Sequence, residues 1–286
     1  MDRILVATDF SPRSDRALRR ASLIASRVGA SLTLVHVVDG DQTQRLVELE
    51  REGASAVLAD TAATLRASDG IAAEWIVEVD DVDAGILLSA EKISADLIVI
   101  GPQRSRFRDF FVGTTAERVL KRSTRPLLVA IGMPSAPHRS TLLALDFDEA
   151  SKAAGRAALA MGIFDHTDVV VMHAFDAPAA GMMRQSMQPP ADIADYEQSQ
   201  RADAGEELRA LLSELGLPST CQTVVSLKGS PARAILETAN NADSSLIMLG
   251  TNQREGFERA LIGSVTADVV RDAQRDVLII PVDEPV

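Results

Sequence analysis

An internal duplication limits the fold of this chain more than any other feature. The segment RILVATDFSPRSDRAL near the start returns as TLLALDFDEASKAAGRAAL, which places Asp9 on Asp146 at an offset of 137 residues. At the same offset SLTLVHVVD returns as DVVVMHAFD, and further on DLIVIG returns as SLIMLG. A repeat over the whole chain predicts two similar units, and 286 residues suit two ordinary domains better than one large domain.

Each copy alternates apolar runs with amphipathic segments. Runs such as ILVAT, LIVI and LLVAI are continuously apolar, which is typical of strands covered on both faces. The strands expected in the first copy are residues 3–8, 31–37, 74–79, 96–100 and 127–131. We therefore predict an α/β fold of two tandem Rossmann-like domains, each a five-stranded parallel sheet flanked by helices.

The boundaries of the two domains follow from the loops. GMPSAPHRS is rich in Pro, Ser and Gly, so we expect the domains at residues 1–133 and 139–286. The second copy has about a dozen extra residues, which we place in 176–200 as a loop before a helix. Strands 127–131 and 277–281 are expected to pair within the molecule as a pseudo-dimer, because the pairing covers exposed sheet edges.

Charge and composition exclude several classes of protein. The net charge of −12 argues against nucleic-acid binding, and the one cysteine and four histidines lack metal-ligand spacing. Apolar runs of six or seven residues are too short for membrane insertion, and the N-terminus lacks signal-peptide features, so we expect a cytoplasmic protein. Residues 1–137 hold 17 basic and 19 acidic groups, whereas residues 138–286 hold 12 and 22. An anionic ligand is therefore easier to accommodate in the first half.

Ligands of doubly wound sheets bind where the first and fourth strands are neighbours. In the second half this rule selects Asp146 and the loop that runs from Gly250 to Gly263 and Ser264. Glycine permits positive φ and close approach of the backbone to phosphate, and a helix N-terminus and a hydroxyl add further donors. The alternative is that these glycines only end a strand and cap a helix. For Asp9 and Asp146 the alternative is capping of the turn into the first helix.

The duplicated TDFS or LDFD turn, the His that ends the second strand and the glycines after the fourth strand resemble the universal stress protein family. The resemblance covers nearly the whole chain and implies two adenine nucleotide alpha hydrolase-like domains. The ATP-binding branch of this family carries G-x2-G-x9-G-[ST] after the fourth strand. Carried over by position, the implied ATP-binding residues are Asp9, Val37, Gly101, Gly113 and Thr114 in the first half, and Asp146, Ala174, Gly250, Gly263 and Ser264 in the second.

The motif is incomplete in both halves. Arg104 replaces the middle glycine of the first half, and eight residues separate it from Gly113 instead of nine. Gln253 replaces the middle glycine of the second half. A side chain at this point crowds the place where backbone meets phosphate, although Arg104, Arg106 and Arg108 offer an alternative grip on an anion.

Two functions from different classes remain open. The first is a non-enzymatic stress-response protein that holds ATP or a related nucleotide in one or both domains. The second is a nucleotide-free scaffold, or a protein that binds another small or lipid-like anion. An enzyme ranks last, because no G-x4-GK[ST] loop is present and lysine is almost absent from the candidate loops. Members of the family also commonly dimerise, so a homodimer is a further expectation.

Overall fold

The computed structural model describes residues 1–102, 114–165, 167–217, 221–227, 229–253 and 263–283. The strands are β1 (Arg3–Ala7), β2 (Ser31–Val38), β3 (Ala73–Val79), β4 (Leu97–Ile100), β5 (Leu127–Val129), β6 (Ser140–Ala144), β7 (Asp168–Phe175), β8 (Cys221–Ser226), β9 (Leu246–Gln253) and β10 (Asp276–Asp283). The helices are α1 (Pro12–Val28), α2 (Gln44–Thr64) with the π-helical turn η1 (Leu65–Asp69), α3 (Val82–Lys92), α4 (Thr115–Arg122), α5 (Glu149–Ala160), α6 (Pro178–Gln185), α7 (Pro190–Leu215), α8 (Pro231–Asn241) and α9 (Ser264–Asp272).

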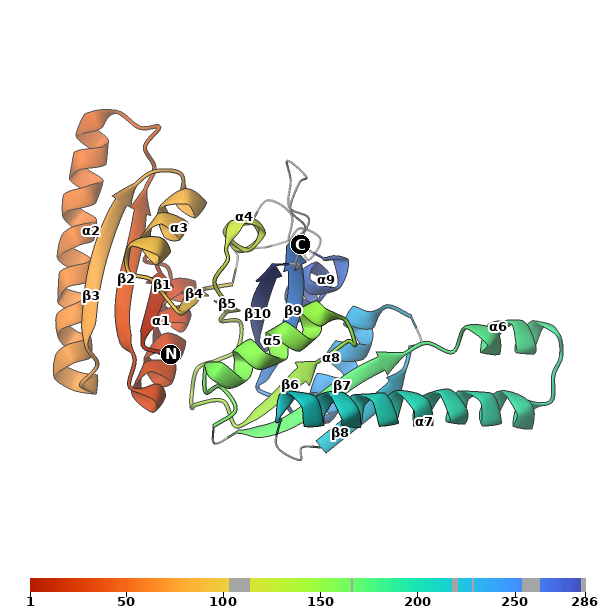
Figure 1. Ribbon diagram of the computed structural model, residues 1–286. Coiled ribbons are helices and arrows are strands. Elements are labelled where there is room, and N and C mark those ends of the chain that lie inside the picture. Colours follow the sequence, from red (N-terminus) through yellow and green to blue (C-terminus); the bar gives the residue numbers. More distant parts are fainter. Residues whose placement is uncertain (103–113, 166, 218–220, 228, 254–262, 284–286) are drawn as a thin grey trace.

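The ten strands form one sheet in the order β3-β2-β1-β4-β5-β10-β9-β6-β7-β8 (Figure 1). All pairs within each half are parallel, which confirms the predicted fold class. The predicted pairing at the junction is confirmed too, because β5 and β10 pair antiparallel with Leu128 opposite Leu278. This pairing joins the two five-stranded sheets into one continuous sheet instead of leaving them separate.

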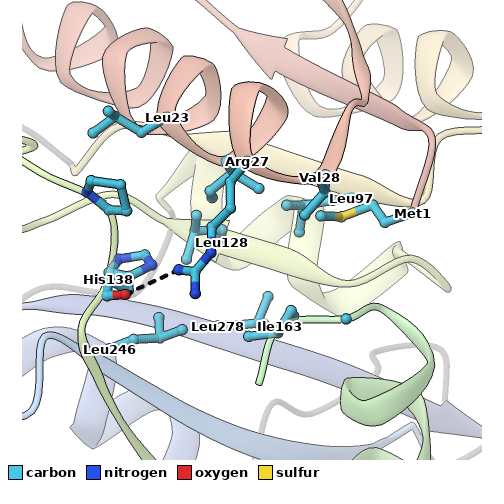
Figure 2. Close-up of a pocket in the computed structure, with 13 residues that line it drawn as sticks. Met1, Leu23, Arg27, Val28, Leu97, Leu128, His138, Ile163, Leu246 and Leu278 are labelled. Atoms are coloured by element: carbon cyan, nitrogen blue, oxygen red, sulfur yellow. Dashed lines mark hydrogen bonds between the residues drawn. The ribbon is translucent and has the colours of Figure 1, made fainter. Parts of the chain in front are cut away.

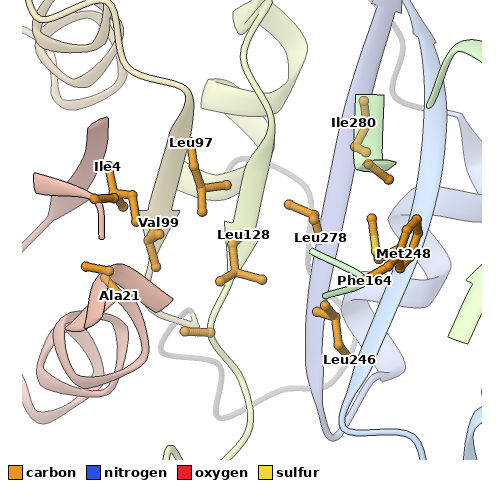
Figure 3. Close-up of a cluster of buried hydrophobic side chains, with 14 of the residues drawn as sticks. Ile4, Ala21, Leu97, Val99, Leu128, Phe164, Leu246, Met248, Leu278 and Ile280 are labelled. Carbon is orange, nitrogen blue, oxygen red and sulfur yellow. The ribbon is translucent and has the colours of Figure 1, made fainter. Parts of the chain in front are cut away.

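Helices cover both faces of the sheet. Buried side chains of α1, α2, α5 and α7 pack on one face, and those of α3, α4, α8 and α9 pack on the other. Figure 3 shows that the core on the face covered by α1, α2, α5 and α7 crosses the junction. Leu97 and Leu128 of the first half lie in the same cluster as Leu278, Leu246 and Met248 of the second. The two halves therefore share a core.

A small cavity of ≈ 40 Å³ lies at this junction (Figure 2). Its lining is mainly apolar and comes from α1, β4, β5, β9, β10 and the segments that hold His138 and Ile163. The Arg27 guanidinium crosses it and donates a hydrogen bond to the carbonyl oxygen of His138, at 3.1 Å. These contacts bind α1 to the connection between the halves.

Local sequence signals explain where the first helix starts and stops. Ser11 caps α1 by accepting a hydrogen bond from the Ser14 N–H at 3.5 Å, and Pro12 occupies the first helical position, as predicted. The helix ends at Gly29, whose φ of 73° is a left-handed conformation that favours glycine. This helix brings the loop after β1 to the carboxyl end of the sheet.

Residues 176–200 were expected to form a loop before a helix; the helix is present, but most of the expected loop is helical as well. Pro178 begins α6 and Pro190 begins α7, so these prolines start helices instead of keeping the segment irregular. The two helices pack together and project from the second half (Figure 1). None of the helices that the structure describes is long and apolar enough to cross a membrane.

Candidate functional site

A large cavity of the second half lies at the carboxyl ends of β6 and β9, where the strand order reverses. Its volume is ≈ 830 Å³. It is lined by all five residues expected in this half, namely Asp146, Ala174, Gly250, Gly263 and Ser264. Residues that are far apart in the sequence meet here because parallel strands end at the same edge of the sheet.

One wall of this cavity is the turn that follows β6. His173 lies at the end of β7, and its Nδ1 is 3.1 Å from the carbonyl oxygen of Leu145. Its ring stacks on Phe147, with the ring centroids 4.0 Å apart. The imidazole therefore fixes the turn that presents Asp146, which agrees with a packing role for the histidine.

The Asp146 carboxylate is itself partly engaged. Its Oδ1 accepts a hydrogen bond from the Phe147 N–H at 2.9 Å, and it lies 3.8 Å from the His173 ring. The cap of α5 is a different residue, because Asp148 accepts a hydrogen bond from the Ser151 N–H at 2.7 Å. Since 76% of the Asp146 side chain is exposed, it remains accessible to a ligand at the mouth of the cavity.

Gly250 is a packing glycine. A Cβ at this position would lie 2.8 Å from the Cβ of Ala154, so α5 can approach β9 only because the side chain is missing. Gly250 and Gly263 do not use the positive φ that glycine permits. Neither is among the glycines with positive φ, and Gly263 has a φ of −52°. Backbone of ordinary conformation suffices here, so these glycines provide space and not left-handed geometry.

The N-terminus of α9 also lines the cavity. Gly263 precedes this helix and has no side chain to accept hydrogen bonds from its first N–H groups. Ser264 begins the helix and is exposed to the cavity. An uncapped helix start directs N–H groups and partial positive charge at a bound anion, and the Ser264 hydroxyl adds a donor.

Several lining residues were not selected from the sequence. Thr251 and Thr266 are buried hydroxyl residues beside the start of α9, and Asp148 adds a second carboxylate. In the sequence, Thr251 could have been found only from its position directly after Gly250. Pro231, at the first position of α8, also lines the cavity.

The cavity at the same place in the first half is smaller, with a volume of ≈ 270 Å³. Asp9, Val37 and Gly101 line it, but Thr114 does not. Thr114 is buried and caps α4, because its Oγ1 accepts a hydrogen bond from the Glu117 N–H at 2.9 Å. Gly113 lies outside the described residues, as do Arg104, Arg106 and Arg108.

The two cavities differ in the side chains of one wall. Val37 fills the space beside Gly85 of α3, where an added Cβ would lie 2.7 Å from Val37 Cγ1. The equivalent positions on β7 and α8 carry Ala174 and Ala234. A methyl group therefore replaces an isopropyl group in the wall of the larger cavity.

Gly101 and Asp9 serve the turn and helix of the first half. A Cβ on Gly101 would lie 2.6 Å from the backbone oxygen of Arg13. The missing side chain therefore allows α1 to pack closely against this loop. Burial raises the pKa of Asp9, but hydrogen bonds from Ser11 and Ser14 and the charge of Arg13 outweigh it and hold the pKa below its usual value. The carboxylate thus stabilises the turn.

His36 repeats the arrangement of His173. Its Nδ1 lies 2.8 Å from the carbonyl oxygen of Thr8, and its ring stacks on Phe10 with centroids 4.4 Å apart. Within the described residues, no three His, Cys, Asp or Glu side chains come together as metal ligands. The described side chains at both sites offer hydrogen bonds and packing surface to a ligand.

The comparisons with known proteins agree with this architecture. The universal stress protein family model matches residues 1–130 and again residues 138–281. A universal stress protein of Mycolicibacterium smegmatis is 27% identical over 97% of this chain and 96% of its own length. The stress response protein NhaX of Bacillus subtilis is 26% identical and matches 45% of this chain with 96% of its own length.

Among solved structures, a universal stress protein from Archaeoglobus fulgidus has a TM-score of 0.74 and 20% identity, with 98% of each chain covered. This similarity supports the fold of both halves together. Because the family model accounts for almost the whole sequence in two consecutive copies, this chain belongs to the universal stress protein family and is a tandem member of it.

Proposed function

We propose that this protein takes part in a stress response and binds an adenine nucleotide, with ATP as the first candidate, in the cavity of its second half. The observation that carries the proposal is the ≈ 830 Å³ cavity at the switch point, which Asp146, Ala174, Gly250, Gly263 and Ser264 all line. Adenine nucleotides are of a size that such cavities hold.

The two ends of the cavity suit the two ends of a nucleotide. Ala174, Leu227 and Ile235 provide apolar surface for a purine, while Asp146 lies beside it as a hydrogen-bond acceptor. The start of α9, with Ser264, faces the place of the phosphates. The sequence expectation favoured the first half on charge, but the volume and the uncapped helix favour the second.

The proposal includes no catalytic step. Phosphoryl transfer needs metal ligands, a positioned cation and a residue that orients water. The described lining residues of the second cavity are hydroxyl-bearing and apolar residues, glycines, His173 and two carboxylates, Asp146 and Asp148. These residues suit retention of a ligand. We also propose that the protein acts in the cytoplasm, as expected from the sequence.

Thermal unfolding with ATP and magnesium tests the proposal, together with native mass spectrometry of freshly purified protein. Ligand at one hundred times its dissociation constant adds about 2.7 kcal/mol to the free energy of unfolding. We expect a rise in Tm and one nucleotide per chain. If ATP leaves the Tm unchanged and the purified protein retains no nucleotide, the proposal is wrong.

The alternative is a scaffold that holds no nucleotide. It is favoured by Gln253, which occupies the place of a glycine in the nucleotide-binding motif, and by the two carboxylates that line the cavity. The same experiment separates the functions, because a scaffold gives an unchanged Tm with each adenine nucleotide tried.

A further inference from the structure

The outer face of α2 carries an apolar stripe that the fold of this chain leaves uncovered. Leu46, Leu49 and Val57 are 48%, 58% and 50% exposed, and their spacing places them on one side of the helix with Gly53 between them. The buried side of the same helix is formed by Ala54, Leu58 and Ala62. The helix is therefore apolar on two sides, although only one side contacts the sheet.

The neighbouring edge strand also carries exposed apolar residues. Trp75 and Val79 of β3 are 38% and 41% exposed, and β3 packs against α2. Figure 1 shows both elements at the end of the molecule that lies away from the second half. Exposed apolar residues that gather on neighbouring elements suggest a contact with another molecule.

The second half provides an internal comparison. Its helix α7 buries Ala204, Leu208 and Leu212, which correspond to the buried Ala54, Leu58 and Ala62 of α2 at an offset of 150 residues. At the same offset, the outer positions Leu49, Gly53 and Val57 become Ser199, Asp203 and Glu207. Because the same scaffold tolerates polar residues there, the stripe on α2 is not a requirement of the fold.

The stripe is complementary to a second copy of itself. If two α2 helices pack antiparallel about a two-fold axis at Gly53, Leu49 of each copy faces Val57 of the other, since each lies four residues from the axis. Gly53 has nothing within 4 Å of an added Cβ and lets the two backbones approach closely.

Charges on the flank of the stripe fit the same arrangement. The two-fold axis brings Arg45 of one copy next to Asp60 of the other, because both lie on the same flank at nearly equal distances from Gly53. Neither side chain forms an ion pair with the described part of its own chain. Two such pairs would form per dimer.

We propose that α2 is an isologous interface through which two copies of this chain associate, with antiparallel α2 helices crossing at Gly53. The β5 edges are used within the molecule, so this contact requires a different surface. Closed two-fold dimers are the commonest assemblies of soluble proteins. The interface lies apart from both nucleotide cavities and does not depend on their occupancy.

Sedimentation velocity of the full chain tests the association. We expect twice the mass of one chain at micromolar concentration, and a dissociation constant raised about a hundredfold by Leu49→Glu or Val57→Glu, because symmetry introduces each change twice. Met187→Glu, at an exposed methionine of the α6–α7 arm, is the matched control and should leave the mass unchanged. A monomeric wild-type protein, or a dimer that both α2 variants leave intact, would overturn the proposal.

Two further variants test the register. Arg45→Glu should weaken the dimer, and adding Asp60→Arg should restore it, because the swapped charges meet again. In a Cys221→Ser background, Gly53→Cys should form a disulfide between copies under mild oxidation, whereas Asp203→Cys at the equivalent position of α7 should not. Equal cross-linking of both variants, or of neither, would overturn an axis at Gly53.

Discussion

Arg20 and Asp276 form an ion pair across the two halves, with Arg20 Nε 2.5 Å from Asp276 Oδ2. Both side chains are at least 95% buried, and Asp276 has no exposed surface. The same carboxylate accepts hydrogen bonds from the Gly132 N–H at 2.7 Å and from His138 Nε2 at 2.8 Å. One acidic side chain of β10 therefore holds α1 and the connection between the halves.

Removing this carboxylate should strongly destabilise the protein. Asp276→Ala leaves the Arg20 guanidinium buried without its partner, and such a loss costs about 3–5 kcal/mol. Urea unfolding gives the free energy. Glu149→Gln is the control. It breaks the exposed pair with Lys152 and should change the free energy of unfolding very little. Equal effects of both changes would contradict a structural role for the buried pair.

His138 should make stability depend on pH. Burial lowers its pKa, and the charges of Arg20 and Arg27 lower it further, although the hydrogen bond and the charge of Asp276 raise it. Because the folded protein then binds a proton less readily than the unfolded chain, stability is full above about pH 6.5 and is lost as the pH falls below it.

Urea unfolding between pH 7.5 and 5 measures this dependence, with His138→Gln as the comparison. Glutamine keeps a hydrogen-bond donor for Asp276 but does not titrate. The variant should lose less free energy of unfolding over this range than the wild-type protein. Parallel curves for the two proteins would show that His138 does not contribute.

Gly101 should tolerate no side chain. Gly101→Ala forces a Cβ against the backbone oxygen of Arg13, at 2.6 Å in the present geometry, and should cost about 1–3 kcal/mol. Gly181→Ala in α6 is the control, because nothing lies within 4 Å of its added Cβ. Helix propensity should make that change stabilising by about 0.5–1 kcal/mol. Thermal unfolding compares both.

The width of the second cavity should control nucleotide binding. Ala174→Val reproduces the Val37 side chain of the first half and should raise the dissociation constant for ATP about tenfold by crowding the purine end. Val37→Ala in the first half is the control and should leave that constant unchanged. Isothermal titration calorimetry measures it, and tighter or equal binding by Ala174→Val would contradict the assignment of this wall.

A carboxylate at the start of α9 should separate ligand binding from stability. In Ser264→Glu the new carboxylate interacts favourably with the helix dipole but repels phosphate. The Tm without ligand should therefore stay unchanged, while the affinity for ATP falls. Thr115→Glu at the start of α4 is the matched change in the first half. If that change lowers the affinity and Ser264→Glu does not, the nucleotide is bound in the first half.

The sequence by itself determined the duplication, the fold class and the residues that meet where the strand order reverses. Continuous apolar runs specify buried parallel strands, and the alternation of helices fixes which strand ends meet, so the pattern of residues alone places Asp146, Gly250 and Ser264 together. Helix signals such as Ser11, Pro12 and Gly29 were equally readable because capping is local.

Only the tertiary structure decided how the two copies differ. The close approach of α1 at Gly101, the valine that fills the space beside Gly85 and the burial of Asp276 depend on residues far apart in the chain. The helices within residues 178–185 and 190–200 were also missed, since proline marks a helix start and a loop alike. Packing between distant segments has no local signature, and for this reason a sequence repeat predicts two sites but not which of them is open.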